Sequence, residues 1–168
     1  LSEGNFVYVG LYSGWVYVFD VRKERYVEKY HVANNAPVYA MIHDGEKVIL
    51  GTYSHYGLKK LVPGSGISNY TFPGKSSQDI VLVSSLLRSG GNLYIGTRTN
   101  GLYRHDGTLL HHYDLDDEER PSGTMISVLM EDSAGNLFVG TYDGGLSILP
   151  HGNSEFIKLT RKDGLSDD

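Results

Sequence analysis

A flat or cationic side chain stands two positions after a glycine at four places in the chain. These residues are Tyr12, Tyr53, Arg98 and Tyr142. Aromatic faces can stack on the C–H surface of a sugar ring, while charged and amide groups bond its hydroxyls. We therefore predict a ligand-binding set in which tyrosines stack and Arg98 and Asp143 make polar contacts. The full set is Tyr12, Tyr53, Tyr56, Arg98, Tyr142 and Asp143.

Catalytic and metal chemistry find little support in the same sequence. The chain has no cysteine, and it contains no nucleophile elbow, phosphate-cradling loop or zinc-binding helix motif. The adjacent His111 and His112 must point to opposite faces of a strand, which favours an exposed outer strand over a shared metal ion. Residues 132–136 resemble the start of a calcium loop but lack its alternating carboxylates, so we predict a hairpin turn. The acidic run at residues 114–119 is interpreted as a solvated loop. We expect no enzymatic activity, no cofactor and no bound metal.

The composition limits the classes of protein to which this chain can belong. The 168 residues are enough for one compact domain, and 40% hydrophobic with 21% charged residues is typical of a soluble globular protein. A net charge of -5 without a Lys/Arg run makes nucleic acid an improbable partner. The longest apolar stretch, residues 80–83, is far too short to cross a bilayer, so we expect no direct membrane contact. The chain does not begin with methionine, and we expect it to be a piece of something longer.

The elements that must position the candidate residues come from an internal repeat. The segment Asn92–Thr97 returns as Asn136–Thr141, and more loosely at residues 47–52 and 7–11. The aligned glycines are Gly10, Gly51, Gly96 and Gly140. Each copy holds four short β-branched and aromatic segments bounded by Gly, Asn, Asp or Ser, which indicates strands joined by tight turns.

Four short strands in every 40 to 45 residues are typical of a β-propeller blade. We predict an all-β protein, a β-propeller of about three and a half to four four-stranded antiparallel blades that form part of a larger ring. The blade repeats cover about 1–35, 36–79, 80–123 and 124–168 of one propeller fragment. Residues 1–3 leave no room for an inner strand in the first copy. The innermost strand of each blade should be the most apolar, and the outermost the most polar.

Strand alternation decides which loops share an end of the ring. The turns between second and third strands, which carry the candidate residues, should meet the links between blades at one end. The alternative for each tyrosine is that it packs against neighbouring blades, and for Trp15 packing is the preferred interpretation. The repeated glycines are expected to serve the backbone and to bind nothing. An open propeller leaves unpaired strand edges, so a homodimer or the remaining blades of a larger receptor are the expected partners.

The repeat resembles a known family, the two-component regulator propeller repeat. The resemblance rests on residues 126–132, 135–141, 144–146 and 163–166 of the fourth copy, and on residues 91–97 and 101–104 of the third. The first two copies match only in outline. The second has Gly45-Glu46-Lys47 in place of the Gly-Asn turn.

The resemblance implies a ligand-sensing module of a two-component signalling receptor. It implies a periplasmic position in an inner-membrane protein, an oligosaccharide ligand, and phosphorelay output through a histidine kinase that this chain does not contain. The alternative is a protein-interaction or dimerisation scaffold without a small-molecule ligand.

Overall fold

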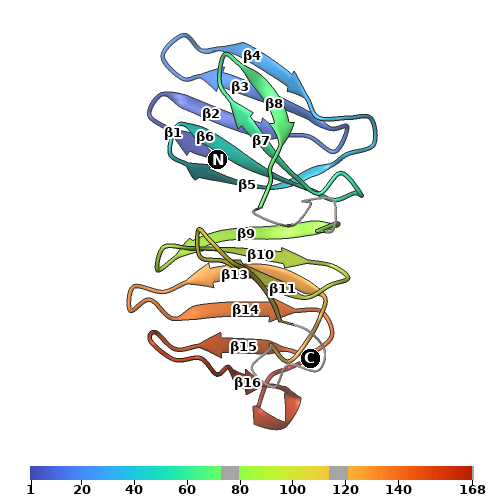
Figure 1. Ribbon diagram of the computed structural model, residues 1–168, viewed down its shortest axis with the longest axis vertical. Helices are drawn as coiled ribbons and strands as arrows, with labels where there is room; N and C mark the ends of the chain where they lie inside the picture. Colours follow the sequence, from blue (N-terminus) through green and yellow to red (C-terminus); the bar gives the residue numbers. More distant parts are fainter. Residues whose placement is uncertain (73–79, 114–120, 168) are drawn as a thin grey trace. The chain divides into compact units, whose positions relative to one another are not determined.

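The computed structural model describes residues 1–72, 80–113 and 121–167. In these residues the chain forms four four-stranded antiparallel sheets and one short 3-10 helix, η2 (Arg161–Asp163), with no α-helix (Figure 1). The sequence prediction of an all-β propeller with about four blades is confirmed. The sheets fall into two compact units of two blades each, which are described separately below.

Unit 1 contains the first two blades. Its strands are β1 (Ser2–Glu3), β2 (Phe6–Gly10), β3 (Trp15–Asp20) and β4 (Arg25–His31), followed by β5 (Val38–Asp44), β6 (Lys47–Thr52), β7 (Leu58–Val62) and β8 (Gly66–Asn69). Within each of the two sheets, every strand pairs with the strand that precedes or follows it in sequence. The prediction that residues 1–3 leave no inner strand was wrong, because Ser2 pairs with Val7 and Glu3 with Phe6.

The two blades of unit 1 share one apolar core. In β3, Val16 and Val18 are buried, whereas the alternate residues are partly exposed, as expected of a strand covered on one face. These two valines and Tyr8 pack with Val48 and Leu50 of the second blade. Burying apolar surface at about 25 cal/mol per Å² is the main source of stability for such a sheet pair.

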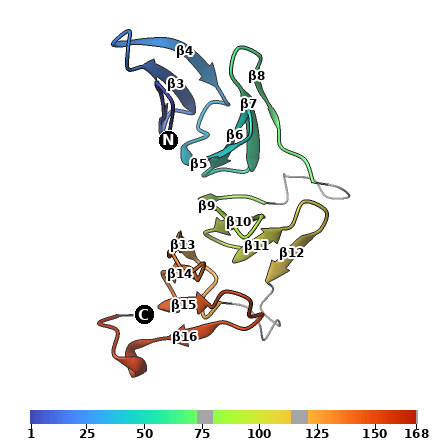
Figure 2. The same ribbon diagram turned by 90° about the vertical axis from the view of Figure 1, so that its left-hand side faces the viewer.

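Unit 2 repeats this arrangement. Its strands are β9 (Val83–Ser89), β10 (Asn92–Thr97), β11 (Leu102–His105) and β12 (Leu110–Tyr113), followed by β13 (Ile126–Glu131), β14 (Leu137–Thr141), β15 (Leu146–Leu149) and β16 (Ile157–Leu159). Tyr94, Leu102 and Tyr113 pack with Leu137 and Val139 of the next blade. The turned view shows strands β9–β12 and β13–β16 of this unit (Figure 2).

In the second and third blades the second strand, and not the first, is the most buried. In β6 and β10 every residue after the first is buried. First strands carry Tyr39, Val128 and Met130, which are each more than half exposed. In these two blades the expected order was wrong, because the first strand is a sheet edge with one ladder partner, whereas the second strand has a partner on each side.

A threonine after the repeat glycine closes the turn between the second and third strands. Its hydroxyl donates to the carbonyl of the glycine that opens the third strand, and its backbone N–H donates to the same oxygen. The pairs are Thr52–Gly57 at 2.7 Å, Thr97–Gly101 at 2.9 Å and Thr141–Gly145 at 3.0 Å. The three receiving glycines have φ between 62° and 72°, which side-chain-bearing residues rarely adopt. The Gly-Thr and Gly-Leu motifs thus specify one turn.

The repeat glycine itself allows a close approach. A Cβ at Gly10 would lie 2.9 Å from Val38 Cγ1, and one at Gly96 would lie 2.5 Å from Ile126 Cγ2. In both cases the neighbour belongs to the first strand of the next blade. The structural interpretation of these two glycines is confirmed, because a larger residue there would push adjacent blades apart.

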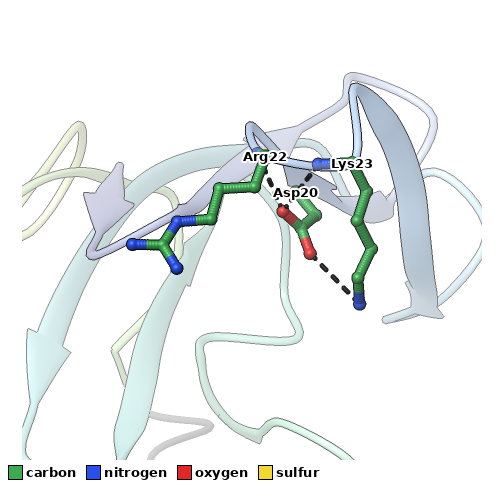
Figure 3. Close-up of polar contacts among 3 residues, drawn as sticks. All are labelled: Asp20, Arg22 and Lys23. Atoms are coloured by element: carbon green, nitrogen blue, oxygen red, sulfur yellow. Dashed lines mark hydrogen bonds and ion pairs between the residues drawn. The ribbon is translucent and has the colours of Figure 1, made fainter.

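Aspartates close several turns at the other end of the blades. The Asp20 carboxylate accepts the N–H groups of Arg22 and Lys23 and pairs with the Lys23 ammonium at 3.3 Å (Figure 3). Asp106 holds the matching turn of the third blade through two backbone N–H bonds. The Asp132 carboxylate accepts the N–H groups of Ala134 and Asn136, so residues 132–136 form the predicted hairpin turn.

Candidate functional site

The turns between second and third strands meet the blade links, as the sequence predicted. In unit 1 the N–H of Tyr53 donates to the Pro37 carbonyl at 2.8 Å. In unit 2 the N–H of Tyr142 donates to the Met125 carbonyl at 3.0 Å. These bonds fix the residue after Gly-Thr against the segment that enters the same blade. The candidate residues therefore stand on a surface that the backbone holds in place.

In unit 2 the structure brings Arg98 and Tyr142 together. The guanidinium carbon of Arg98 lies 4.0 Å from the centre of the Tyr142 ring, well within the range of a cation–π contact. The two residues occupy the same repeat position on adjacent blades. Tyr142 is 61% exposed and Arg98 is half-buried. The pair presents an aromatic ring and a cation side by side at the surface.

Asp143 is already bound to the link that precedes its blade. Its carboxylate accepts the N–H groups of Thr124 and Met125 and the Thr124 hydroxyl, all within 3.2 Å. Partial burial opposes ionisation of this carboxyl, but the N–H groups of Met125 and Thr124 outweigh it and lower its pKa. Asp143 thus positions the link beside Tyr142, and its predicted contact with a ligand stays a prediction.

In unit 1 Tyr53 pairs with a residue that sequence reasoning missed. The ring centres of Tyr53 and Tyr39 lie 4.7 Å apart, with the planes tilted by 35°. Tyr39 lies at a register shift between Val38 and Ala40 of β5. Such an irregularity redirects a side chain, and nothing in the local pattern of apolar residues signals it. The two tyrosines form an aromatic surface at the end of the second blade.

The other two tyrosines of unit 1 lie apart from this pair. Tyr12 is 76% exposed, more than Tyr142 at 61%. Tyr56 packs beside His55, and the Lys59 ammonium lies 5.6 Å from its ring centre. Among the described residues no ring contact joins Tyr12, Tyr53 and Tyr56. Their joint role as a stacking set stays a prediction.

Trp15 and the two adjacent histidines have packing partners. Trp15 stacks on His31 of its own sheet at 4.4 Å, which agrees with a packing role. His112 stacks on Tyr103 at 4.2 Å. β12 is the outer edge strand of its sheet, as expected, but His111 and His112 are half-buried and not exposed. The aromatic neighbours of this strand cover the imidazole rings.

Some predicted positions lie outside the described residues. They are the links at residues 76–79 and 119–120, the acidic run at residues 114–119, and Asp168. In the described part of the chain no helix is long and apolar enough to span a bilayer.

Comparison with known proteins places the fold among solved structures. Neither a protein-family model nor a curated protein matches the sequence. The extracellular domain of the hybrid two-component system BT3049 from B. thetaiotaomicron superposes with a TM-score of 0.72 and 18% identity, over 98% of this chain and 22% of that one. The corresponding domain of BT4673 from the same organism gives a TM-score of 0.65 and 24% identity, over 88% of this chain and 20% of that one.

A designed protein shows the same fold. The computationally designed Ika4 protein matches with a TM-score of 0.64 and 16% identity, over 90% of this chain and 88% of that one. The chain thus spans nearly all of Ika4 but only about a fifth of the two extracellular domains. At these identities the likeness establishes the propeller architecture.

Proposed function

We propose that the chain is a ligand-sensing propeller module of a two-component signalling receptor. It binds an oligosaccharide at the turns between second and third strands. The module stands in the periplasm and acts on a histidine kinase that lies outside this chain. It binds without chemical conversion, and a ligand shifts the receptor only by the difference in affinity between its two states.

The contact between Arg98 and Tyr142 is the observation that carries the proposal. An exposed ring held beside a guanidinium offers a sugar one apolar face and a set of hydrogen-bond donors. The Tyr39–Tyr53 pair offers a second aromatic surface in unit 1. Tyr53, Arg98 and Tyr142 lie on turns that threonine and glycine hold rigid, and rigid turns lower the entropy that binding must overcome. The likeness to extracellular domains of hybrid two-component systems supports the signalling role.

A glycan array followed by titration tests the proposal. We expect saturable binding of a neutral oligosaccharide by the full chain. Arg98→Ala/Tyr142→Ala should weaken binding at unit 2, and Tyr39→Ala/Tyr53→Ala binding at unit 1, each about fivefold or more, because each removes stacking worth on the order of 1 kcal/mol or more. Tyr26→Ala is the control, since it removes an exposed tyrosine from β4. Binding that both double variants retain in full, or no binding to any glycan, would refute the proposal.

A scaffold without a small ligand is the second candidate function. One row of apolar residues crosses all four strands of the last blade: Met130 pairs with Phe138, Phe138 with Ile148, and Ile148 with Ile157. Met130 and Ile157 are each more than half exposed. A contiguous exposed apolar surface often marks a protein interface. Light scattering tests this function. A stable dimer that Met130→Glu dissociates, together with no binding to any glycan on the array, would favour the scaffold.

A further inference from the structure

Unit 2 contains a polar cleft at the end of its blades opposite to Arg98 and Tyr142. Strand β10 begins at Asn92 beside the cleft and ends at Thr97, next to the candidate site. The cleft has a volume of about 200 Å³. Its walls come from the first hairpin of the third blade, from β11, and from two turns of the fourth blade. The polar side chains lining it include Asn92, Tyr94, Arg104, His151 and Asn153.

Arg104 is the only arginine or lysine that lines this cleft. The ion pairs of the described chain join Lys23 to Asp20, His43 to Glu3 and Lys47 to Asp44, and none of them involves Arg104. Arg104 is the cross-strand partner of Tyr94, whose side chain is buried, and its guanidinium lies where it can donate to the Tyr94 hydroxyl. Burial raises the pKa of Tyr94, so the phenol stays neutral and keeps its proton. Among the described residues this guanidinium therefore forms no ion pair, and its charge acts on the carboxylate of Asp106 in the turn after β11.

In unit 1 a hydrogen bond between the blades crosses the matching place. There Tyr8 pairs with Val18 in the register in which Tyr94 pairs with Arg104 in unit 2. The turn after β7 packs onto the first blade, where the Gly64 N–H donates to the Tyr30 hydroxyl at 2.8 Å. Tyr30 donates in turn to Glu28. Unit 1 thus has an apolar residue and an interblade hydrogen bond where unit 2 has an arginine and an open cleft.

From this difference we propose that the cleft of unit 2 is a binding site for a small hydroxylated carboxylate of the sugar-acid class. Arg104 receives the carboxylate, because its planar fork can donate two parallel hydrogen bonds to the two oxygens. Asn92, His151 and Asn153 line the cleft and are available to the hydroxyl groups. The volume is below the roughly 300–1,000 Å³ of drug-sized pockets, which favours one sugar unit over a longer chain.

A second carboxylate near the cleft, Glu131, tests whether the binding depends on charge. Glu131 is exposed and accepts a hydrogen bond from the Ser89 hydroxyl at 2.7 Å. Its charge also acts on Tyr94, so it is felt in the cleft. Removing that charge should favour an anion and leave a neutral sugar unaffected.

Titration of the full chain with D-glucuronate, followed by amide NMR shifts, tests this proposal. We expect saturable binding with a Kd on the order of 1 mM, because a ligand of this size has few atoms to contribute. D-glucose is the neutral counterpart and should bind at least tenfold more weakly. Sulfate is the second anion: it should bind more weakly than glucuronate if the hydroxyl groups contribute.

Variants assign the binding to Arg104. Arg104→Gln keeps a donor for Tyr94 but should weaken glucuronate at least tenfold, the loss expected for one charge-assisted pair. Glu131→Gln should tighten it about twofold or more. Arg25→Gln removes an exposed cation from β4 of unit 1 and should change nothing. Circular dichroism verifies that each variant is folded.

Three results would overturn the proposal. They are no saturable shift with glucuronate, equal binding of glucose, and unchanged affinity in folded Arg104→Gln. The outcome is independent of the oligosaccharide surface, because Arg98→Ala/Tyr142→Ala should leave glucuronate binding intact while it weakens binding at the other end.

Discussion

Replacing Thr52 by valine removes the hydroxyl of a fully buried residue and preserves the shape of the side chain. The hydroxyl donates to the Gly57 carbonyl at 2.7 Å and accepts from the Ser54 hydroxyl at 3.2 Å. The Gly57 carbonyl keeps the backbone N–H of Thr52 at 3.1 Å, so this loss is one ordinary hydrogen bond, about 1 kcal/mol. The buried Ser54 hydroxyl loses its acceptor, which costs about 1 kcal/mol more. We expect the free energy of unfolding to fall by about 2 kcal/mol.

Urea denaturation followed by Trp15 fluorescence measures this loss. Trp15 is the only tryptophan in the chain and lies in unit 1 with Thr52. The melting temperature should fall by about 4–8 °C for a chain of this length. The matched control is Thr71→Val, which changes an exposed threonine of the same unit and should stay within about 0.5 kcal/mol.

A double variant tests the cause of the loss. In Thr52→Val/Ser54→Ala both partners of the buried bond are absent, so the penalty for an unmatched donor disappears. The sum of the losses in unfolding free energy of the two single variants should therefore exceed the loss of the double variant by about 1 kcal/mol. If Thr52→Val costs no more than Thr71→Val, the hydroxyl does not hold the turn and the explanation of the Gly-Thr motif is incorrect.

Three further changes probe other parts of the fold. Gly96→Ala places a Cβ 2.5 Å from Ile126 Cγ2 and should lower the free energy of unfolding by about 1–3 kcal/mol in urea titrations; a neutral result would remove the close-approach argument. Tyr30→Phe removes the hydroxyl that accepts from Gly64 and should cost about 1 kcal/mol, with faster amide exchange at Gly64; unchanged exchange would contradict the interblade bond. Asp143→Asn should cost about 1 kcal/mol at pH 7, because the folded state lowers the pKa of Asp143 and so favours its ionised form. That cost is fully present above the unfolded pKa of about 3.9 and should vanish as pH falls through the lower folded pKa; a gap that persists in stronger acid would exclude the charge as its cause.

Much of the fold could be predicted from the spacing of a few residue types. The Gly-Thr and Gly-Leu pairs mark the second and third strands because their turn needs a positive φ and a hydroxyl at fixed positions. Strand alternation then placed Tyr53 and Tyr142 beside the blade links. Burial was harder to predict, because it depends on which strand has partners on both sides, and the apolar content of a strand does not report this.

The site was predictable only at the level of position. The cation–π contact of Arg98 with Tyr142 joins adjacent blades, and a single repeat says nothing of it. Tyr39 was missed because it lies at a register shift, and Asp143 was assigned to a ligand before its bonds to the blade link could be seen. Arg104 lies in the middle of a strand, where its sequence context does not suggest a binding role. It stands out only because Val18 occupies the equivalent position in unit 1.

The account is tested most directly by an amide NMR titration of the full chain with the neutral oligosaccharide that binds best on the array. We predict saturable shifts at Tyr53, Arg98 and Tyr142, with the turns at residues 90–92 and 132–136 unaffected. Shifts confined to those hairpin turns, or no saturable shift at any of the three residues, would contradict the assignment of ligand binding to the turns between second and third strands.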